Sequence, residues 1–170
     1  MALSAGAALA APATASATPA NITVACQANG QVHFNPGVTV FPSDQDVTYQ
    51  GQDGPCNDYS MYNIRSATFT ANFNGVSLGC LESGSSGFSS GTGSIDWTDR
   101  SGNTGRSTLS LQIDGSSLNV GHLSGYVRDG YFVGHSFSAT VETSLLGGAG
   151  KCTIGGGLKD ASFTGDFSII

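Results

Sequence analysis

The stretch SATFTANFNGVSLGC, residues Ser66–Cys80, shows the pattern that decides the fold. Every second residue at its start is apolar, with Ser, Thr or Asn between, so one face of an extended chain collects Ala67, Phe69, Ala71 and Phe73. Asn74-Gly75 follows, and Asn-Gly suits the type I′ turn because both central residues need a positive φ. The stretch predicts two antiparallel strands joined by a tight hairpin, with one apolar and one solvated face.

Similar signals recur along the chain. Three more pairs of this kind lie between strand-like runs, and they predict hairpins at Asn29-Gly30, Asp114-Gly115 and Asp129-Gly130. The alternation from 104 to 144 predicts a three-strand meander that continues through Tyr131, Val133 and Phe137. No stretch after residue 20 carries the apolar stripe of an amphipathic helix.

These patterns predict an all-β fold. We expect an antiparallel β-sandwich of immunoglobulin-like size with about eight to ten strands, and a closed barrel is the alternative. Trp97, in register with Ile95, is expected in the core. Loops are expected at 42–61, 82–92, 99–106 and 145–160.

The composition excludes some classes of partner. The chain has 170 residues, of which 11% are charged and 25 are glycine, and its net charge is −6. Six basic residues are too few for the phosphate-binding surface of a nucleic-acid-binding protein. We expect one domain at 18–170, with neither nucleic acid nor a membrane among its partners.

The first residues predict export. Residues 1–17 are uncharged and Ala-rich, and they end in small-x-small sites of the kind that signal peptidase cleaves. Because a basic n-region is missing, we expect the true start of this signal peptide to lie upstream. The mature protein is then expected to be secreted and extracellular.

The four cysteines agree with an oxidising environment. Cys26, Cys56, Cys80 and Cys152 have no C-x-x-C spacing, which argues against a zinc site or a redox motif. An even number in an exported chain predicts two disulfides, and four cysteines allow three pairings. The apolar register of their strands slightly favours a Cys26–Cys80 bridge.

Candidate catalytic and metal-binding motifs are weak. We expect no catalytic residues, metal site or cofactor, because each motif that matches such a site lacks the surroundings that the site needs. The matches are Gly87–Gly91 for a nucleophile elbow, Gly147–Lys151 for a phosphate loop, Asp96 with Asp99 for a glycosidase pair, and His33, His122 and His135 for a metal. His135 is expected to pack in the apolar register. One alternative stays open, a calcium ion at Asp44, Asp46, Asp53 and Asp58 in the 42–61 loop.

Five stretches carry a resemblance to a known group of proteins. They are CQANGQVHFNPGVTV (26–40), NIRSATFTANFNGVSLGC (63–80), GTGSIDWTD (91–99), SGYVRDGYFVG (124–134) and GKCTIGGGLKDASFTGDF (150–167). The chain resembles small secreted β-sandwich proteins of filamentous Gram-positive bacteria, and among them the adaptor subunit of umbrella-shaped toxin particles. The resemblance implies a non-catalytic adaptor that links a toxin-bearing scaffold protein to a lectin-bearing subunit in antagonism between bacteria.

The functional expectation is therefore a secreted protein-binding module, whose contact residues the sequence does not identify. Strand addition at an exposed 21–27 edge is one way in which it could bind. One alternative is a carbohydrate or cell-wall binder that uses the rings of Tyr59, Tyr62, Tyr126, Tyr131 or Trp97, the last two being expected in the core. Another is a protease inhibitor that presents Lys151 or Arg106 on a loop.

Overall fold

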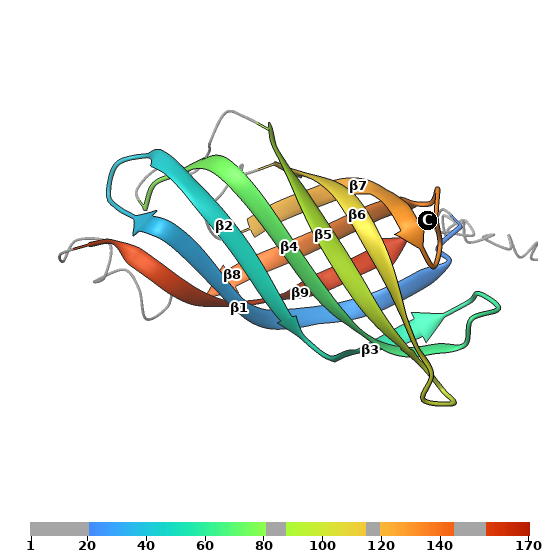
Figure 1. The fold of residues 1–170 in the computed structure, drawn as a ribbon. Coiled ribbons are helices and arrows are strands. Elements are labelled where there is room, and N and C mark those ends of the chain that lie inside the picture. The colour runs from blue at the N-terminus through green and yellow to red at the C-terminus, as the bar shows by residue number, and fades with distance from the viewer. Residues whose placement is uncertain (1–20, 81–87, 115–119, 145–155) are drawn as a thin grey trace, which may run out of the picture.

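The computed structural model describes residues 21–80, 88–114, 120–144 and 156–170. Within these ranges the chain forms nine antiparallel strands (Figure 1), which are β1 (Val24–Val38), β2 (Ser43–Gln52), β3 (Gly54–Asp58), β4 (Ile64–Leu78), β5 (Phe88–Asp99), β6 (Thr104–Asp114), β7 (Val120–Gly130), β8 (Ser136–Ser144) and β9 (Leu158–Ile169). The predicted all-β, antiparallel class and the number of strands are confirmed. The described ranges contain no candidate for a membrane-spanning helix.

The strands form one sheet that closes on itself. β1 pairs with β9 on one side and with β2 and β3 on the other, β2 also pairs with β4, and every strand from β4 onward pairs with the next. In Figure 1, β2, β4 and β5 cross in front of β7, β8 and β9, so the closed barrel has a near and a far layer in this view. The two layers of the predicted sandwich are present, but hydrogen bonds join them on both sides, as in the closed-barrel alternative.

Because the sheet closes on itself, the start of β1 is not the exposed edge that the sequence predicts. Val24, Ala25 and Cys26 pair with β3, and the same residues pair with Ile169, Ser168 and Phe167 of β9. The 21–27 segment is therefore not an exposed edge, and the strand-addition hypothesis is wrong for it.

β2 and β3 occupy one position in the ring. Both lie between β1 and β4, and Asp53 separates them. The prediction of a loop at 42–61 is therefore wrong over Ser43–Gln52 and Gly54–Asp58. The alternation in β2 is weak because only Gln45, Val47 and Tyr49 point inward, among polar neighbours.

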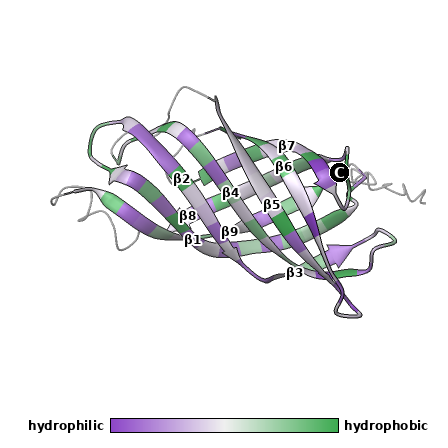
Figure 2. Ribbon diagram, viewed as in Figure 1, coloured by the Kyte–Doolittle hydropathy of each residue, from purple (hydrophilic) through white to green (hydrophobic). Residues whose placement is uncertain are grey.

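Aromatic side chains fill the space between the two layers. The rings of Phe69 and Phe137 stack with centroids 5.5 Å apart, and Phe167 lies 5.8 Å from each of them. Trp97, expected in the core, is 1% exposed. The bands of alternating hydropathy along the strands in Figure 2 reflect this inward and outward alternation.

Two of the predicted hairpin turns lie inside long strands. Asn29-Gly30 sits in the middle of β1, where Gly30 pairs with both Gly51 and Phe163. Asn74-Gly75 sits in β4, where the register against β2 shifts and Gly75 has a φ of 66°. Gly75, at a positive φ, therefore marks a bulge within β4. Gly30 lets β2 approach β1 closely, because an added Cβ there would overlap the Gln50 carbonyl oxygen.

The connection after Asp129-Gly130 also differs from the prediction. β7 ends at Gly130, and the chain turns at 131–134 before β8 begins. Phe132 is buried with a φ of 61°, whereas Val133 and His135 are exposed. The expected inward register of Val133 and His135 is therefore wrong. The meander that contains this turn is confirmed, because β6 pairs with β7 and β7 with β8.

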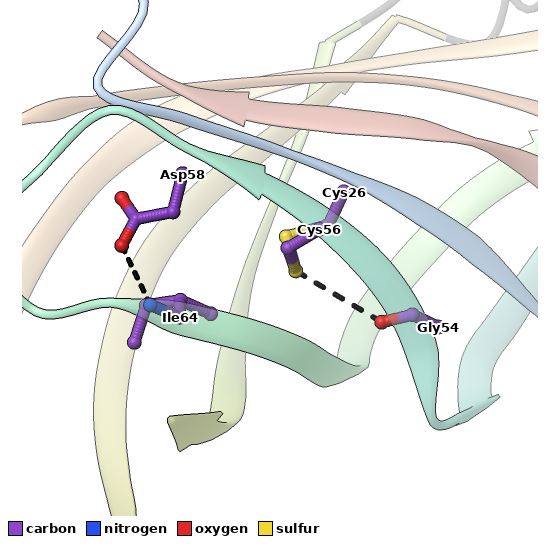
Figure 3. The surroundings of a disulfide bond; sticks show 5 residues. All are labelled: Cys26, Gly54, Cys56, Asp58 and Ile64. Atoms are coloured by element: carbon purple, nitrogen blue, oxygen red, sulfur yellow. Dashed lines mark hydrogen bonds between the residues drawn. A yellow bond between two sulfur atoms is a disulfide. The ribbon is translucent and has the colours of Figure 1, made fainter. Parts of the chain in front are cut away.

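One disulfide is fully described, and it joins Cys26 of β1 to Cys56 of β3 (Figure 3). The two residues are direct partners in the strand pairing, with Cα atoms 4.0 Å apart, so the favoured Cys26–Cys80 bridge is wrong. Cys80 is disulfide-bonded as well, and Cys152 lies outside the described residues. The Cys26–Cys56 bond is compatible with an oxidising compartment.

Candidate functional site

The three histidines lie on different elements of the barrel. His33 Nδ1 is 2.8 Å from Asp160 Oδ1, where β1 meets β9, and His122 Nδ1 is 3.3 Å from Thr140 Oγ1. His135 lies in the exposed turn after β7. Among the described side chains, no three of His, Cys, Asp and Glu gather closely enough to hold a metal ion.

The carboxylates considered for calcium do not converge either. Asp44 and Asp46 are exposed along β2, and Asp53 follows that strand. Asp58 already accepts two backbone hydrogen bonds, from Ser60 and Ile64. The structure therefore does not gather these groups around one point.

Asp96 and Asp99 have separate structural partners. The guanidinium of Arg106 donates to both oxygens of Asp96, at 2.5 and 2.9 Å. Arg106 thus lies on β6 in an ion pair, whereas the inhibitor hypothesis places it on a loop. The other candidate for that role, Lys151, lies outside the described residues. The whole Gly147–Lys151 match to a phosphate loop lies outside them as well.

The Gly-x-Ser-x-Gly match also lacks its required context. Gly87 lies outside the described residues, and 88–91 belong to β5. A nucleophile elbow needs a strand that turns sharply into a helix, whereas these residues continue along a strand.

A concentration of exposed apolar side chains lies at one end of the barrel. Seven large hydrophobic side chains are exposed in the described ranges, and Phe41 lies in the β1–β2 connection at the opposite end. The other six form what we call the aromatic end: Tyr59, Met61, Tyr62, Tyr126, Val133 and Ile170. Met61 is 88% exposed. In Figure 1 this end carries the C-terminus, the β3–β4 loop and the β5–β6 turn.

Backbone contacts connect the segments of the aromatic end. The Tyr59 N–H donates to the Thr23 carbonyl at 3.0 Å, and the Thr23 N–H donates to Ile169 at 2.8 Å. Ser136 and Ile170 exchange two hydrogen bonds, and Ser136 is also the pairing partner of Tyr126. The exposed side chains therefore stand on neighbouring strands and loops of one surface.

The β3–β4 loop, which carries three of these side chains, is held at both of its ends by one carboxylate. Asp58 Oδ1 accepts the Ser60 N–H at 2.8 Å, and Oδ2 accepts the Ile64 N–H at 2.6 Å (Figure 3). β3 and β4 pair only at Gly54 and Pro55, so the Asp58 side chain bridges the strands where their ladder has ended. The loop is held in one shape by charge-assisted hydrogen bonds.

The β5–β6 turn is closed in a similar way. Asp99 Oδ1 accepts the backbone N–H groups of Ser101 and Asn103, and Oδ2 accepts the Asn103 side-chain amide, each at 2.8 Å. These bonds, that from the Asn103 side chain above all, hold the pKa of Asp99 below its ordinary value, against partial desolvation. The Arg100 N–H donates to Asn63 at 3.0 Å and joins this turn to the β3–β4 loop.

Phe132 anchors the third segment, the β7–β8 turn. Its ring is 4% exposed and meets Trp97 at 5.2 Å and Tyr62 at 4.9 Å. Tyr62 also stacks on Tyr131, with centroids 4.6 Å apart. Inside the barrel, Trp97 Nε1 donates to Ser107 Oγ at 2.8 Å, and that hydroxyl donates to the Tyr131 carbonyl. The loops of the aromatic end are thus tied to the core.

A second feature is a polar hollow on the outer wall. It has a volume of about 350 Å³ and is lined by Gln27, Ala28, Asn29, Thr140, Glu142, Thr164, Gly165 and Asp166. An adjoining hollow of about 380 Å³ shares Gln27 and Asp166 with it and reaches the Cys26–Cys56 bond. The lining offers carboxylates, amides and hydroxyls but contains neither an aromatic ring nor a basic side chain, so it gives no stacking face for a sugar.

Sequence reasoning found part of the aromatic end. It singled out Tyr59, Tyr62 and Tyr126 as rings that a ligand could reach, and all three are exposed. Trp97 and Tyr131 were expected in the core, and Trp97 is fully buried, whereas Tyr131 packs against the core in part. Met61, Val133 and Ile170 were missed, and only the run Tyr59-Ser60-Met61-Tyr62, with three large side chains in a loop, gave a signal.

Comparison of the chain with protein families, with curated proteins and with solved structures finds no match to any of them.

Proposed function

We propose that the protein is a secreted, non-catalytic protein-binding module and that the aromatic end is its binding surface. The observation that supports this most is that, of the seven large hydrophobic side chains exposed in the part of the chain that the structure describes, six gather on one end. Scattered exposed apolar residues are ordinary on a protein surface, but a gathered set is typical of an interaction site.

The composition of this end favours a protein partner. Tyrosine and methionine are enriched at the centres of protein interfaces, because their side chains are large and lose little freedom or adapt well to a neighbour. The loops are already held by Asp58, Asp99 and Phe132, so binding would cost little ordering entropy.

Two alternatives receive less support. A carbohydrate binder needs open ring faces, and one face of Tyr62 is covered by Tyr131. A trypsin-type inhibitor that presents Arg106 would first have to break its ion pair with Asp96. The resemblance to adaptor subunits of toxin particles is consistent with a protein-binding role and suggests other secreted proteins as partners.

The test compares three forms of the exported protein, each with a C-terminal tag on a long flexible linker. The forms are wild type, the Tyr59→Ser, Met61→Ser double variant and a Phe41→Ser control at the opposite end. We expect wild type and Phe41→Ser to co-purify with the same secreted protein from culture supernatant, and the double variant to lose it. All three residues are exposed, so the variants should keep the stability of the wild type.

Two results would overturn the proposal. One is that all three forms elute as lone monomers or retain the same proteins equally. The other is that wild type binds chitin or peptidoglycan and the double variant does not, which would assign the aromatic end to carbohydrate.

A further inference from the structure

The polar hollow on the outer wall is built from two rows of side chains that cross three strands. β8, β9 and β1 lie side by side there (Figure 1). Strand pairing aligns the first row as Thr140, Asp166 and Gln27, and the second as Glu142, Thr164 and Asn29. Between the rows the hollow is lined by Gly165 and Ala28, whose small size leaves room for a ligand.

The two carboxylates of the hollow have no partner in the part of the chain that the structure describes. Glu142 and Asp166 are exposed, and neither forms an ion pair or accepts a hydrogen bond there. They stand at diagonal positions of the β8–β9 pairing, where side chains are about 7–8 Å apart. Their charges therefore repel each other, and a cation between them would remove this repulsion.

The charges around the hollow have the same sign. The next outward positions on the neighbouring strands carry neither lysine nor arginine in the described ranges, and the one basic side chain there is His122, whose ring bonds to Thr140. Asp53 follows Gln52, the pairing partner of Asn29, and adds a negative charge on the other side. With a net charge of −6 for the whole protein, this wall attracts cations.

The neutral groups of the hollow supply further hydrogen-bond acceptors. Asn29 Oδ1 is buried from solvent and receives no hydrogen bond from the described residues. A buried carbonyl oxygen without a donor is unfavourable, and in a native structure it often marks a place where a further group binds. The Gln27 amide and the Thr164 hydroxyl lie next to it along the rows and offer two more oxygens.

We propose that the hollow binds an organic cation with several N–H donors, an alkylammonium or a guanidinium group, between Glu142 and Asp166. Such groups donate three or more hydrogen bonds and accept none, which matches a site made of carboxylate, amide and hydroxyl oxygens. A calcium ion is less suited, because it needs six to eight oxygen ligands and no three of His, Cys, Asp and Glu gather closely enough among the described side chains. The inference goes beyond the proposed function and does not depend on the aromatic end.

The test follows the backbone amide signals of the full exported protein, isotope-labelled for NMR, during titration with diaminobutane at constant physiological ionic strength. We expect saturable shifts at Gln27, Thr140 and Gly165, and none at Thr70 of β4. Butanediol, which has the same carbon chain without the charges, is the matched ligand control and should cause no such shifts.

A double variant tests the two carboxylates. Glu142→Gln, Asp166→Asn should weaken the binding of diaminobutane by roughly tenfold or more, because it removes two charge-assisted hydrogen bonds. Both side chains are exposed, so the variant should keep the fold. The Asp44→Asn, Asp46→Asn control changes the net charge equally on β2 and should leave the affinity within about twofold, since screening weakens distant charges.

A second titration distinguishes the source of the cation. A short glycine peptide with two lysines and blocked ends is compared with diaminobutane. Tighter binding of the peptide would assign the hollow to a basic segment of a protein, and tighter binding of diaminobutane would assign it to a free amine. Either result supports the cation site.

Three results would overturn the inference. They are the absence of saturable shifts with both cations, an equal loss of affinity in the two double variants, and tighter binding of calcium than of either cation at these same amides. None of them would touch the proposed role of the aromatic end, which is tested with other residues.

Discussion

The ring of Phe132 packs against the indole of Trp97, with centroids 5.2 Å apart and planes at 66°, although Phe132 comes from a turn and Trp97 from β5. Phe132 holds this place at a φ of 61°, a conformation that is unfavourable for a residue with a side chain. The contact therefore connects the fold of the barrel to the shape of the aromatic end.

Phe132→Ala should lower the free energy of unfolding by about 3–5 kcal/mol, the usual range for removing a buried ring. Phe132→Gly should lower the free energy of unfolding by less than the loss of the whole side chain predicts, because glycine at this φ relieves roughly 1 kcal/mol of backbone strain. Urea unfolding monitored by Trp97 fluorescence measures both. Val133→Ala serves as the control, with an expected change within about 0.5 kcal/mol. An unfolding midpoint of Phe132→Ala equal to that of wild type would show that the ring does not anchor the turn.

Replacing both Cys26 and Cys56 by Ala should cost about 3–4 kcal/mol, because the bond closes a segment with a sequence separation of 30 and limits the unfolded chain. The double variant is preferable to a reducing agent, since Cys80 is also disulfide-bonded. Guanidinium unfolding curves of the two proteins give the difference. A variant as stable as wild type would show that strand pairing alone holds β3 against β1.

Asp99 should make the protein less stable in acid. Its pKa is lower in the folded protein than in the unfolded chain, because Asn103 and neighbouring amides bond to the ionised form. The stabilisation is therefore complete above the ordinary aspartate pKa of about 3.9 and is lost as the pH falls through the lower folded value. Thermal unfolding between about pH 2 and 6 should show a shallower acid dependence in Asp99→Asn than in wild type. Parallel curves for the two proteins would contradict the prediction.

Tyr49 should make the protein sensitive to alkali. It lies inside the barrel, edge-on to Phe163 at 5.2 Å, and burial raises its pKa well above the ordinary value of about 10. The neutral phenol is favoured in the folded state, so this contribution is complete below pH 10 and is lost as the pH rises further. Phenolate absorbance should show Tyr49 ionising only together with unfolding. Tyr49→Phe should unfold at a higher pH than wild type, and identical alkaline midpoints would rule this out.

Gly165→Ala should be strongly destabilising, although Gly165 lies in the middle of β9. A Cβ at this position would overlap the carbonyl oxygen of Thr140 and come within 2.9 Å of the Val141 Cα, both of which are backbone atoms. The neighbouring Thr164→Ala, on the exposed outer face, should change stability by no more than about 0.5 kcal/mol. Thermal unfolding of the two variants is the measurement. Equal stability would mean that β8 and β9 can separate at this point without cost.

The alternation in the sequence was sufficient to predict which faces are buried. Phe69, Leu111 and Phe167 all lie in the core, because a period of two is a direct property of an extended chain. The pairing of the strands was harder to predict from the sequence. His33 contacts Asp160, 127 residues further along the chain, and no local pattern encodes that contact. Closure into one ring depends on such contacts between β1 and β9.

The misplaced turns have one physical origin. Strands of 15 residues must bend strongly to close a barrel, and they do so where a glycine lets the backbone coil or approach a neighbour. Gly30 and Gly75 serve this purpose within β1 and β4, and the same dipeptides would form hairpins between shorter strands.

The aromatic end was only partly visible in the sequence for a related reason. Val133 follows the alternation that leads into β8, so it looked like a core residue. The positive φ of Phe132 reverses the pattern by one residue, and Val133 turns out to solvent. Tyr59 and Tyr62 were identified as rings that could offer stacking faces, and both are exposed.

The hydrogen bond from Thr23 to Ile169 places the two ends of the described chain side by side. A short peptide from 170 to 23 would make the backbone circular, and a new opening in the exposed 39–42 connection would leave every strand in its place. Such a circular permutant would carry its fusion partners at the far end of the barrel, with the six exposed side chains clear of both termini.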